Sequence, residues 1–573
     1  MTPSPSVPKI LTPLLFPIIA AAGAIVLRKT GLPWINWALL LLISIYLILT
    51  LTQPELSRKE AAIALFGIAL SLAFLHAFRS PYISINGDIP FESFVFKETL
   101  SKGWNLTRYN GSEKWMRYIG LTSVTVYPTM VAHITGWKID VFRVGYRVIE
   151  ATIPITIFAI FDRLTDRRTA FAAAALFPLQ WVFITLIGSI ARMNIAYVLF
   201  FDIILLLTRP SITSERRDFI LVILLITIVP THYTVAIISI IIFIGYIIFK
   251  SIIETIHNSL FTSHLSEAPP LSGNVVLILG GIVFVWYGYV STDILVGIAS
   301  GIIGLIASIE SITAFNISGG GNGSGSAPLA ATLTKGVYYG TIGIGGIGLV
   351  AAWRSQGRDS LSPMWVVFGI VAFIGLGATF ITTRFFGGYG PFRMFYQLLP
   401  FISIPIIIGV SVSARVVNNV LNINRELLAH IVVAVFLVIH LFAGTYAFYD
   451  LTGTPHGELF ATEGKRVDTS LVNPSEDEMA RWINEYATTG VPIWADYHGE
   501  HIIARYKAVE ARDGLGLVGV RRQSISDYII LRTENVDQSM VNTKYRGKYD
   551  LSRLRQVIEK KNKVYASGAE VYR

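Results

Sequence analysis

AAIALFGIALSLAFLHAFRSPYISINGDIPFESFVF (Ala61–Phe96) joins a long apolar run directly to a polar segment that carries two carboxylates. Its first part, residues 61–78, contains no Asp, Glu, Lys or Arg and is long enough to cross a bilayer as a helix. Asp88 and Glu92 follow shortly after that run. Ionisable groups are costly to hold at a membrane boundary and usually mark a functional site. The stretch therefore predicts a membrane helix followed by a candidate site.

The rest of the chain has the same apolar character. It has 573 residues, of which 53% are hydrophobic and 15% charged, and its mean hydropathy is +0.57. This composition excludes an ordinary soluble protein and predicts a mainly α, polytopic membrane protein of about thirteen spans. The predicted spans lie near 11–27, 36–52, 61–78, 142–161, 170–187, 193–208, 218–230, 233–250, 274–290, 331–352, 363–381, 394–412 and 428–448.

Lys and Arg in the short loops predict the orientation, because cytoplasmic loops are enriched in both. With a cytoplasmic N-terminus, the inside loops carry the larger set: Arg58, Lys59, Arg163, Arg167, Arg168, Arg209, Arg216, Arg217, Arg354, Arg358, Arg415 and Arg425. The outside loops carry the smaller set: Arg28, Lys29, Arg192, Arg384 and Arg393. We therefore predict a multi-pass cell-membrane protein with residues 79–141, 291–330 and the C-terminal region outside.

The net charge of +10 does not indicate nucleic acid. Residues 450–573 hold 18 Lys and Arg against 18 Asp and Glu, so the excess lies in the membrane part. Positive-inside loops and anionic lipid account for it. The chain has no cysteine, which excludes disulfides, thiolate nucleophiles and cysteine-bound metals.

Three regions follow from the pattern of apolar runs. Residues 1–60 hold the first helices, and 61–449 form the larger membrane unit with a large outside loop at 79–141. Residues 450–573 have an ordinary globular composition and predict a small α/β domain. Helical periodicity there covers Glu476–Tyr486 and Arg553–Lys563, and strand-like runs cover Val491–Trp494, Leu515–Val520 and Tyr528–Leu531.

The acidic pair offers two kinds of chemistry. On a helix, Asp88 and Glu92 share one face because they are four residues apart. Two such carboxylates can bind a divalent cation, or one can act as general base while the other orients it. The simpler interpretation is a solvated loop whose acids cap a helix that starts near Pro90.

Basic residues at outside helix boundaries are candidates for binding an anionic substrate. Arg384 and Arg393 lie among aromatic and glycine residues in ITTRFFGGYGPFRMFYQLLP (Ile381–Pro400), and arginine suits phosphate through its fork of donors. Arginines that snorkel from an aromatic belt look the same in sequence. Arg192 and His232 lie at the outside ends of other spans, where a lone histidine is most often a packing residue.

The combination of these segments resembles the GT-C superfamily of membrane glycosyltransferases, which includes protein mannosyltransferases, aminoarabinose transferases and oligosaccharyltransferases. It is most similar to an archaeal set of predicted membrane proteins related to that class. The residues that carry the likeness are Gly87-Asp88-Ile89, Glu92, Gly103-Trp104, the section Val126–Trp181, and Thr231–Ala236.

The resemblance implies a sugar transfer from a polyprenyl-phosphate donor, of the dolichyl-phosphate type, to a protein or glycan acceptor at the outer face. An acid in the first large outside loop would act as base or metal ligand, which corresponds to Asp88 and less directly to Glu92. A cation at a late outside loop would hold the lipid phosphate, which corresponds to Arg384 or Arg393. The resemblance leaves open a divalent metal ion and the role of the first two helices.

Two other functions remain open from the sequence. An oligosaccharyltransferase-like enzyme would use Glu310 and the IWADYHG segment (Ile493–Gly499), although Asp496 there also fits a strand end that leads into a turn. A transporter or a membrane scaffold would not need the acidic pair. Transporters show internal repeats and charges within spans. No repeat is visible, and Glu150 and Asp202 could each pair with a neighbouring arginine.

Overall fold

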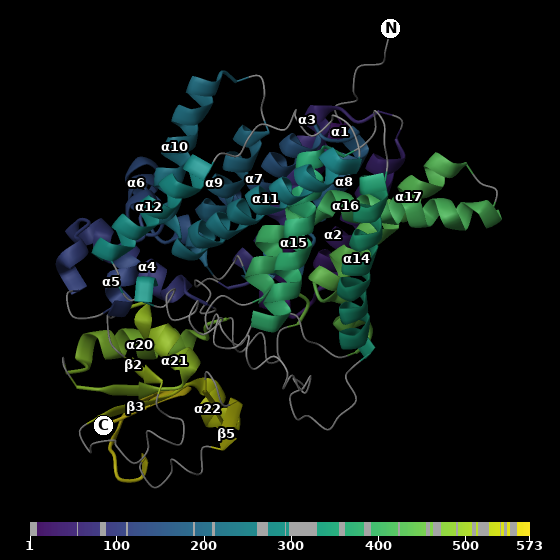
Figure 1. Cartoon of the computed structure of the whole chain (residues 1–573). Helices are drawn as coiled ribbons and strands as arrows, with labels where there is room; N and C mark the ends of the chain where they lie inside the picture. The colour runs from purple at the N-terminus through teal and green to yellow at the C-terminus, as the bar shows by residue number, and fades with distance from the viewer. Residues whose placement is uncertain are drawn as a thin grey trace, which may run out of the picture.

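The computed structural model describes the membrane part and most of the C-terminal region (Figure 1). The described residues are 8–53, 55–80, 87–109, 113–186, 190–208, 212–260, 273–290, 292, 294–296, 329–354, 361–382, 391–421, 424–453, 459–461, 471–488, 491–506, 511–513, 527–538, 540–543, 547–550 and 558–573. Glu310, Arg384 and the strand-like run at 515–520 lie outside them.

Long apolar helices make up the membrane part. They are α1 (Pro8–Thr30), α2 (Trp34–Thr52), α3 (Arg58–Ala77), α7 (Tyr146–Phe161), α8 (Arg167–Ala175), α9 (Ala191–Leu207), α10 (Ser214–Thr231), α11 (Tyr233–Leu260), α12 (Gly273–Val290), α14 (Leu329–Arg354), α15 (Pro363–Thr382), α16 (Pro391–Leu421) and α17 (Arg425–Gly444). Within the described ranges, nine helices are long and apolar enough to cross a membrane. The prediction of a polytopic helical membrane protein is confirmed.

Twelve of the thirteen predicted spans overlap a helix along most of their length. The span predicted at 170–187 is wrong as a continuous helix, because α8 ends at Ala175 and a short π-helix, η3, occupies Val182–Leu186. Pro178 lies between them and has no N–H to continue the helical ladder. The predicted spans at 218–230 and 233–250 are separate helices, because α10 ends at Thr231 and α11 begins at Tyr233.

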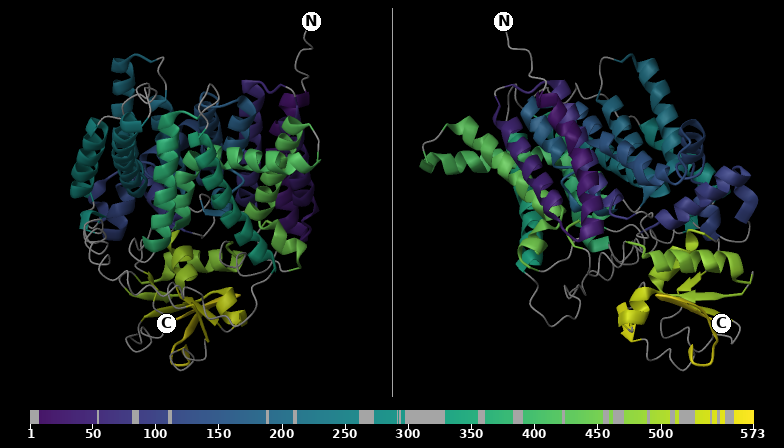
Figure 2. Two further views of the ribbon diagram at one scale, coloured as in Figure 1. Left: turned by 45° about the vertical axis from the view of Figure 1, so that its right-hand side comes forward. Right: turned by 180° about the vertical axis from the view of Figure 1, so that it is seen from behind.

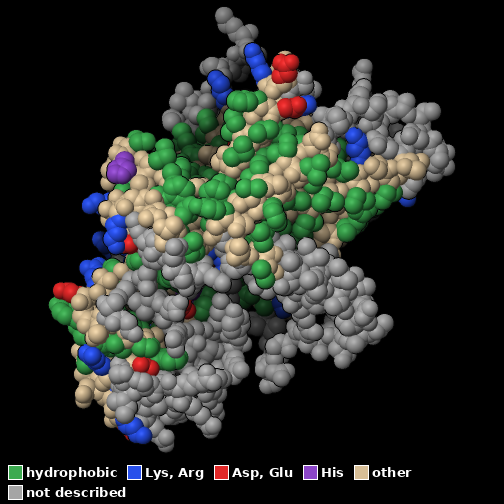
Figure 3. All heavy atoms as spheres, turned by 60° about the vertical axis from the view of Figure 1, so that its left-hand side comes forward, with side chains coloured by type: hydrophobic (Ala, Val, Ile, Leu, Met, Phe, Trp, Pro, Cys, Tyr) green, Lys and Arg blue, Asp and Glu red, His purple; other side chains and the backbone are tan. Residues whose placement is uncertain are grey.

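Side chains on the bundle surface suit a lipid environment. Figure 3 shows a broad face of hydrophobic side chains over the helices, with most charged side chains above and below it. Glycines permit close helix contacts inside the bundle: a Cβ at Gly348 of α14 would lie 1.7 Å from the carbonyl oxygen of Pro405 in α16. Small residues commonly allow such backbone approach between membrane helices.

Short helices between α3 and α7 cover one end of the bundle. They are α4 (Ile89–Lys102), η1 (Leu106–Tyr109), α5 (Glu113–Ile119), α6 (Val126–Thr135) and the π-helix η2 (Val141–Gly145). Their apolar side chains share a core that includes Phe91, Trp115, Tyr118 and Phe142. This core also includes Tyr146 of α7 and Ala191 of α9, so it packs α4 against the bundle.

The C-terminal α/β domain lies at the same end as α4 and opposite the start of α1 (Figures 1 and 2). Its elements are α20 (Pro474–Tyr486), β1 (Ile493–Ala495), α21 (Tyr497–Ala504), β2 (Ala511–Asp513), β3 (Tyr528–Leu531), α22 (Thr533–Gln538), β4 (Met540–Thr543), β5 (Gly547–Asp550), β6 (Lys563–Ser567) and β7 (Ala569–Tyr572).

The five-stranded sheet has the order β2-β1-β3-β7-β6, and β4 and β5 form a separate hairpin. β1 runs parallel to β2 and β3, whereas β7 runs antiparallel to β3, with Ile530 opposite Val571. The predicted helix in α20 and the strands β1 and β3 are present. The helix predicted over Arg553–Lys563 is wrong at its end, because Lys563 begins β6.

Candidate active site

Asp88 lies at the N-cap position of α4, where a glycine turn brings the chain into the helix. Gly87 has φ 64°, a conformation that glycine adopts at no steric cost, and Pro90 occupies the first turn of the helix. The Asp88 side chain makes no capping hydrogen bond. It is instead available for interactions with another part of the chain.

Arg192, at the start of α9, joins the two acids that the sequence singled out. One Nη donates to Glu92 Oε1 at 2.5 Å, and the other donates to Asp88 Oδ2 at 2.5 Å. The backbone N–H of Ala191 donates to Glu92 Oε2 at 2.8 Å. The side chains of Glu92 and Arg192 are 0% and 4% exposed, whereas that of Asp88 is 28% exposed. Asp88 is therefore the member of this triad that substrate can reach.

Tyr118 of α5 closes one side of the triad. The Arg192 guanidinium carbon lies 5.3 Å from the centroid of the Tyr118 ring, within the range of a cation–π interaction. The Tyr118 side chain also hydrogen-bonds Asp88. Sequence reasoning missed Tyr118, since one tyrosine in an amphipathic helix carries no sign that it contacts an acid thirty residues earlier.

The two carboxylates differ in proton affinity. Burial raises the pKa of Asp88, but the charges of Arg192 and Arg393 and the hydrogen bonds from Arg192 and Tyr118 outweigh burial and hold it well below its usual value. Burial raises the pKa of Glu92 to about 7, and the negative charge of Asp88 adds to the rise against the opposing effect of Arg192. The pKa values of two acids that share one guanidinium separate in this way because the more buried acid is harder to ionise.

Arg393 and His232 lie within electrostatic range of the triad. The charge of Arg393 acts on both Asp88 and His232, and the charge of Arg192 acts on His232 as well. The Arg393 carbonyl accepts a hydrogen bond from the Tyr197 hydroxyl at 3.2 Å, which fixes the start of α16 against α9. Three of the predicted site residues, Asp88, Glu92 and Arg192, thus form one hydrogen-bonded cluster, and the charge of Arg393, more than 300 positions after Asp88, acts on it.

His232 presents a hydrogen-bond donor at this site. It lies between α10 and α11, is 1% exposed, and its Nδ1 accepts the backbone N–H of Val235 at 3.4 Å. The neutral ring then carries its proton on Nε2. Among the described residues, that Nε2 has no hydrogen-bond partner. Burial and then the two arginines lower the pKa of His232 well below its usual value, so the ring stays neutral.

The acids do not fit the divalent-cation arrangement considered from the sequence. The Arg192 guanidinium occupies the position between Asp88 and Glu92 that a cation would take. Within the described residues, no group of three or more His, Asp or Glu side chains is placed to hold a metal ion. One oxygen of each carboxylate is thus already bonded to Arg192.

Asp496 of the IWADYHG segment has a structural role. It follows β1 and caps α21, where its Oδ1 accepts the Gly499 N–H at 2.7 Å. Its Oδ2 accepts from Asn535 Nδ2 at 3.1 Å, and the residue is fully buried. The acid lies at a strand end, as considered from the sequence, but it leads into helix α21 and not into a turn. Glu150 likewise pairs with Arg147 at 3.1 Å, as considered from the sequence.

Comparisons with solved structures give matches of low identity over most of the chain. The chain is similar to the oligosaccharyltransferase of Archaeoglobus fulgidus, solved with a tethered acceptor peptide, at 13% identity and a TM-score of 0.49, covering 83% of this chain and 69% of the other. It is also similar to ArnT of Cupriavidus metallidurans bound to undecaprenyl phosphate, at 13% identity and a TM-score of 0.45, covering 89% and 97%. The apo form of ArnT gives 14% identity, a TM-score of 0.44, and coverage of 90% and 98%.

At such identities and TM-scores we infer no activity from these matches. No curated protein matches the chain. The sequence model of one family, described as "Predicted membrane protein (DUF2206)", matches residues 217–573. The matched part includes His232, Arg393 and the C-terminal domain. Because it covers more than half of the chain, this protein belongs to the DUF2206 family of membrane proteins.

Proposed function

We propose that this protein is a membrane glycosyltransferase that moves a sugar from a polyprenyl-phosphate donor to an acceptor at the outer face of the membrane. The observation that carries the proposal is the partly exposed carboxylate of Asp88, which is paired with Arg192 and whose pKa the positive charge of Arg393 also lowers. A lipid-linked phosphate needs a cation at the membrane boundary, and a sugar acceptor needs a group that takes its proton.

In the proposed reaction, Asp88 acts on the acceptor and Arg393 acts on the donor phosphate. The acceptor's oxygen or nitrogen attacks the anomeric carbon, the bond from that carbon to the phosphate oxygen breaks, and the electron pair leaves with the prenyl phosphate. Asp88 takes the acceptor's proton. Since Asp88 has a low proton affinity, it accepts that proton late, after bond formation has made the acceptor more acidic.

The donor phosphate would lie against Arg393. This guanidinium can stabilise the negative charge that grows on the departing phosphate, which is a large contribution in transfer reactions. Because His232 is 1% exposed, it would not contact the phosphate directly. The prenyl chain dissolves in the surrounding lipid. Arg384, the other predicted phosphate ligand, is proposed on sequence alone.

Arg192 and Glu92 act through Asp88 in this scheme. Arg192 is nearly fully buried and already bonded to both acids, so it holds Asp88 in place and keeps it ionised. Glu92 in turn fixes the guanidinium, and it is itself held by a hydrogen bond from the backbone N–H of Ala191. The sequence had suggested Arg192 as a substrate ligand and Glu92 as a catalytic acid; the geometry favours a positioning role for each.

The test is a transfer assay in membranes that contain the full chain and polyprenyl-phosphate hexoses as donors, with release of prenyl phosphate as the readout. Asp88→Asn should lower release by about 100-fold or more, the usual contribution of a general base. Glu98→Gln is the matched control on the same helix, because Glu98 pairs with Lys102 one turn later. Wild-type release in Asp88→Asn would exclude the proposed role, and donor binding without release in the wild type would favour a scaffold.

A further inference from the structure

Aromatic rings connect the C-terminal domain to the acid site. His501 of α21 packs edge-on against Phe91 of α4, with ring centroids 5.2 Å apart at 82°. Phe91 stacks on Tyr118 at 5.6 Å and 16°. Tyr118 hydrogen-bonds Asp88 and covers the Arg192 guanidinium. A continuous set of contacts therefore leads from the domain to the carboxylate.

The first ring in this series is held firmly within the domain. His501 is 5% exposed and also packs on Tyr497, with centroids 4.4 Å apart. The helix that carries it is capped by the buried Asp496. At its other end, Arg505 Nη1 donates to Asp477 Oδ1 of α20 at 3.0 Å. Helix α21 is thus fixed at both ends to its own domain.

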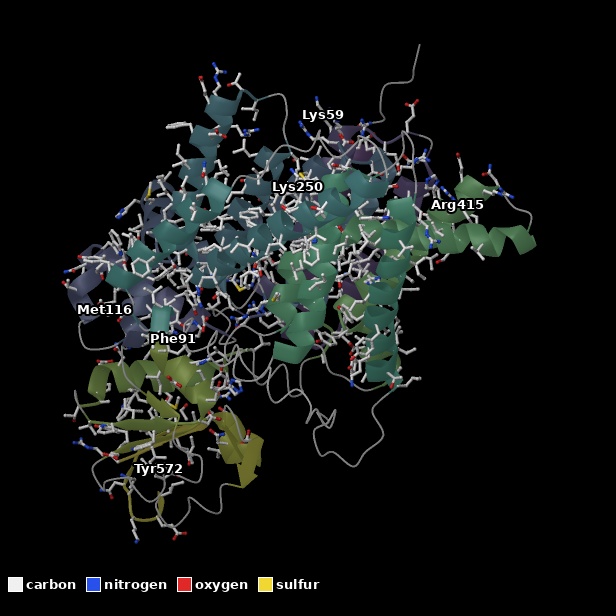
Figure 4. The ribbon with its side chains drawn as sticks, viewed as in Figure 1. Lys59, Phe91, Met116, Lys250, Arg415 and Tyr572 are labelled. Carbon is white, nitrogen blue, oxygen red and sulfur yellow. The ribbon has the colours of Figure 1, made fainter. Side chains whose placement is uncertain are left out.

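Further contacts join α21 to α4 along its length. Lys97 Nζ donates to the Arg505 carbonyl at 3.3 Å and lies 5.1 Å from the centroid of the Tyr506 ring. Ala504 belongs to the same buried core as Phe91 and Tyr118. Figure 4 shows Phe91 where α4 meets the C-terminal domain. The domain therefore covers the face of α4 that adjoins the acids.

We propose that the C-terminal domain positions the acid site, with His501 as a positioning residue that acts through Phe91 and Tyr118. Without this contact, Phe91 loses one of its ring contacts, and Tyr118, which stacks on Phe91, can withdraw from Asp88. The consequence for sugar transfer rests on the function proposed above. The mechanical part, support of α4 by α21, does not depend on it.

Hydrogen exchange of the full chain in lipid nanodiscs tests the mechanical part. In His501→Ala, backbone amides of α4 should exchange faster, whereas His501→Phe, which restores a ring, should keep wild-type protection. His498→Ala is the matched control, because His498 lies on the same helix and its ring packs on Tyr497 at 5.1 Å. Unchanged protection of α4 in His501→Ala would overturn the proposal.

The transfer assay tests the consequence for chemistry. His501→Ala should lower kcat about 10-fold with KM within about twofold, because a displaced Asp88 affects the transition state more than donor binding. His501→Phe should restore most of the rate. Faster exchange in α4 with an unchanged kcat would contradict the positioning role.

Phe91→Leu provides an independent variant on the other side of the contact, in case His501→Ala disturbs the folding of the domain. It should reproduce both the faster exchange and the lower kcat. If the wild type transfers no sugar, the proposed function fails while the exchange data still decide whether the domain supports α4. Wild-type exchange and kcat in Phe91→Leu would contradict the inference.

Discussion

At the residue scale, one guanidinium gives two neighbouring acids different properties. Arg192 bonds both, yet Asp88 is partly exposed and ionised whereas Glu92 is fully buried with a pKa of about 7. The exposed acid can contact a substrate. The buried acid can act on the exposed acid only through Arg192. This difference comes from burial, which a spacing of four residues does not reveal.

The raised pKa of Glu92 predicts an acidic limb in the pH–rate profile, that is, a transfer rate that falls as the pH is lowered. As pH falls through about 7, Glu92 gains a proton and weakens its ion pair with Arg192. Arg192 then acts on Asp88 alone and lowers its proton affinity further, so the transfer rate should fall. The limb should disappear in Glu92→Gln and persist in Glu98→Gln when rates are measured from pH 5 to 9. An identical limb in Glu92→Gln would assign it to another group.

The position of Arg192 between the acids predicts that transfer does not need a divalent cation. Treatment of the membranes with EDTA should leave the release of prenyl phosphate unchanged, because the guanidinium already forms an ion pair with each carboxylate. Loss of activity on chelation, with recovery on adding Mn²⁺ or Mg²⁺, would contradict this expectation. EDTA treatment of the Glu98→Gln variant serves as a parallel control.

The sequence predicted the identity of the site residues better than it predicted the contacts between them. Asp88 and Glu92 stood out because charged residues are rare beside apolar runs, and Arg192 and Arg393 stood out for the same reason. That Arg192 bridges both acids follows from the packing of α9 against the outside loop, which local patterns do not contain. Tyr118 had no signal at all.

At the element scale, helices α14 and α16 meet through glycines that leave no room for a side chain. Gly348→Ala would place a methyl group 1.7 Å from the Pro405 oxygen, so we expect a loss of about 1–3 kcal/mol of stability from overpacking. Gly343→Ala in the same helix is the control, since nothing lies within 4 Å of its added Cβ. Thermal unfolding in detergent would measure both, and equal midpoints would contradict the packing.

Hydropathy predicted the helices well because each apolar run must satisfy its backbone internally in lipid. The exceptions are local. Pro178 interrupts the predicted span at 170–187, a signal that was present in the sequence but weaker than the apolar character around it. In the C-terminal domain, Lys563 begins a strand because β6 pairs with β7, a tertiary contact that outweighs the helical pattern of the preceding charges.

At the scale of the whole molecule, the C-terminal domain and α4 lie at the end of the bundle opposite the start of α3 (Figures 2 and 4). With the predicted cytoplasmic N-terminus, both lie outside. The chain has no cysteine, so single cysteines can be placed without background. Glu485→Cys should react with a membrane-impermeant thiol reagent in intact cells, whereas Lys59→Cys should react only after lysis. The reverse pattern would invert the orientation and remove the acid site from the outer face.

The most direct measurement asks whether Asp88 and Arg393 share one site. In the double variant Asp88→Cys, Arg393→Cys, a short bifunctional thiol reagent added to membranes should join the two positions, detected after cleavage at a protease site introduced between them. The pair Asp88→Cys, Arg415→Cys is the control, because Arg415 lies on the same helix, α16, about 33 Å further along it. We expect cross-linking in the first pair only. Failure of the first pair to cross-link, or equal cross-linking in both, would contradict a common site for the acid and the phosphate-binding arginine.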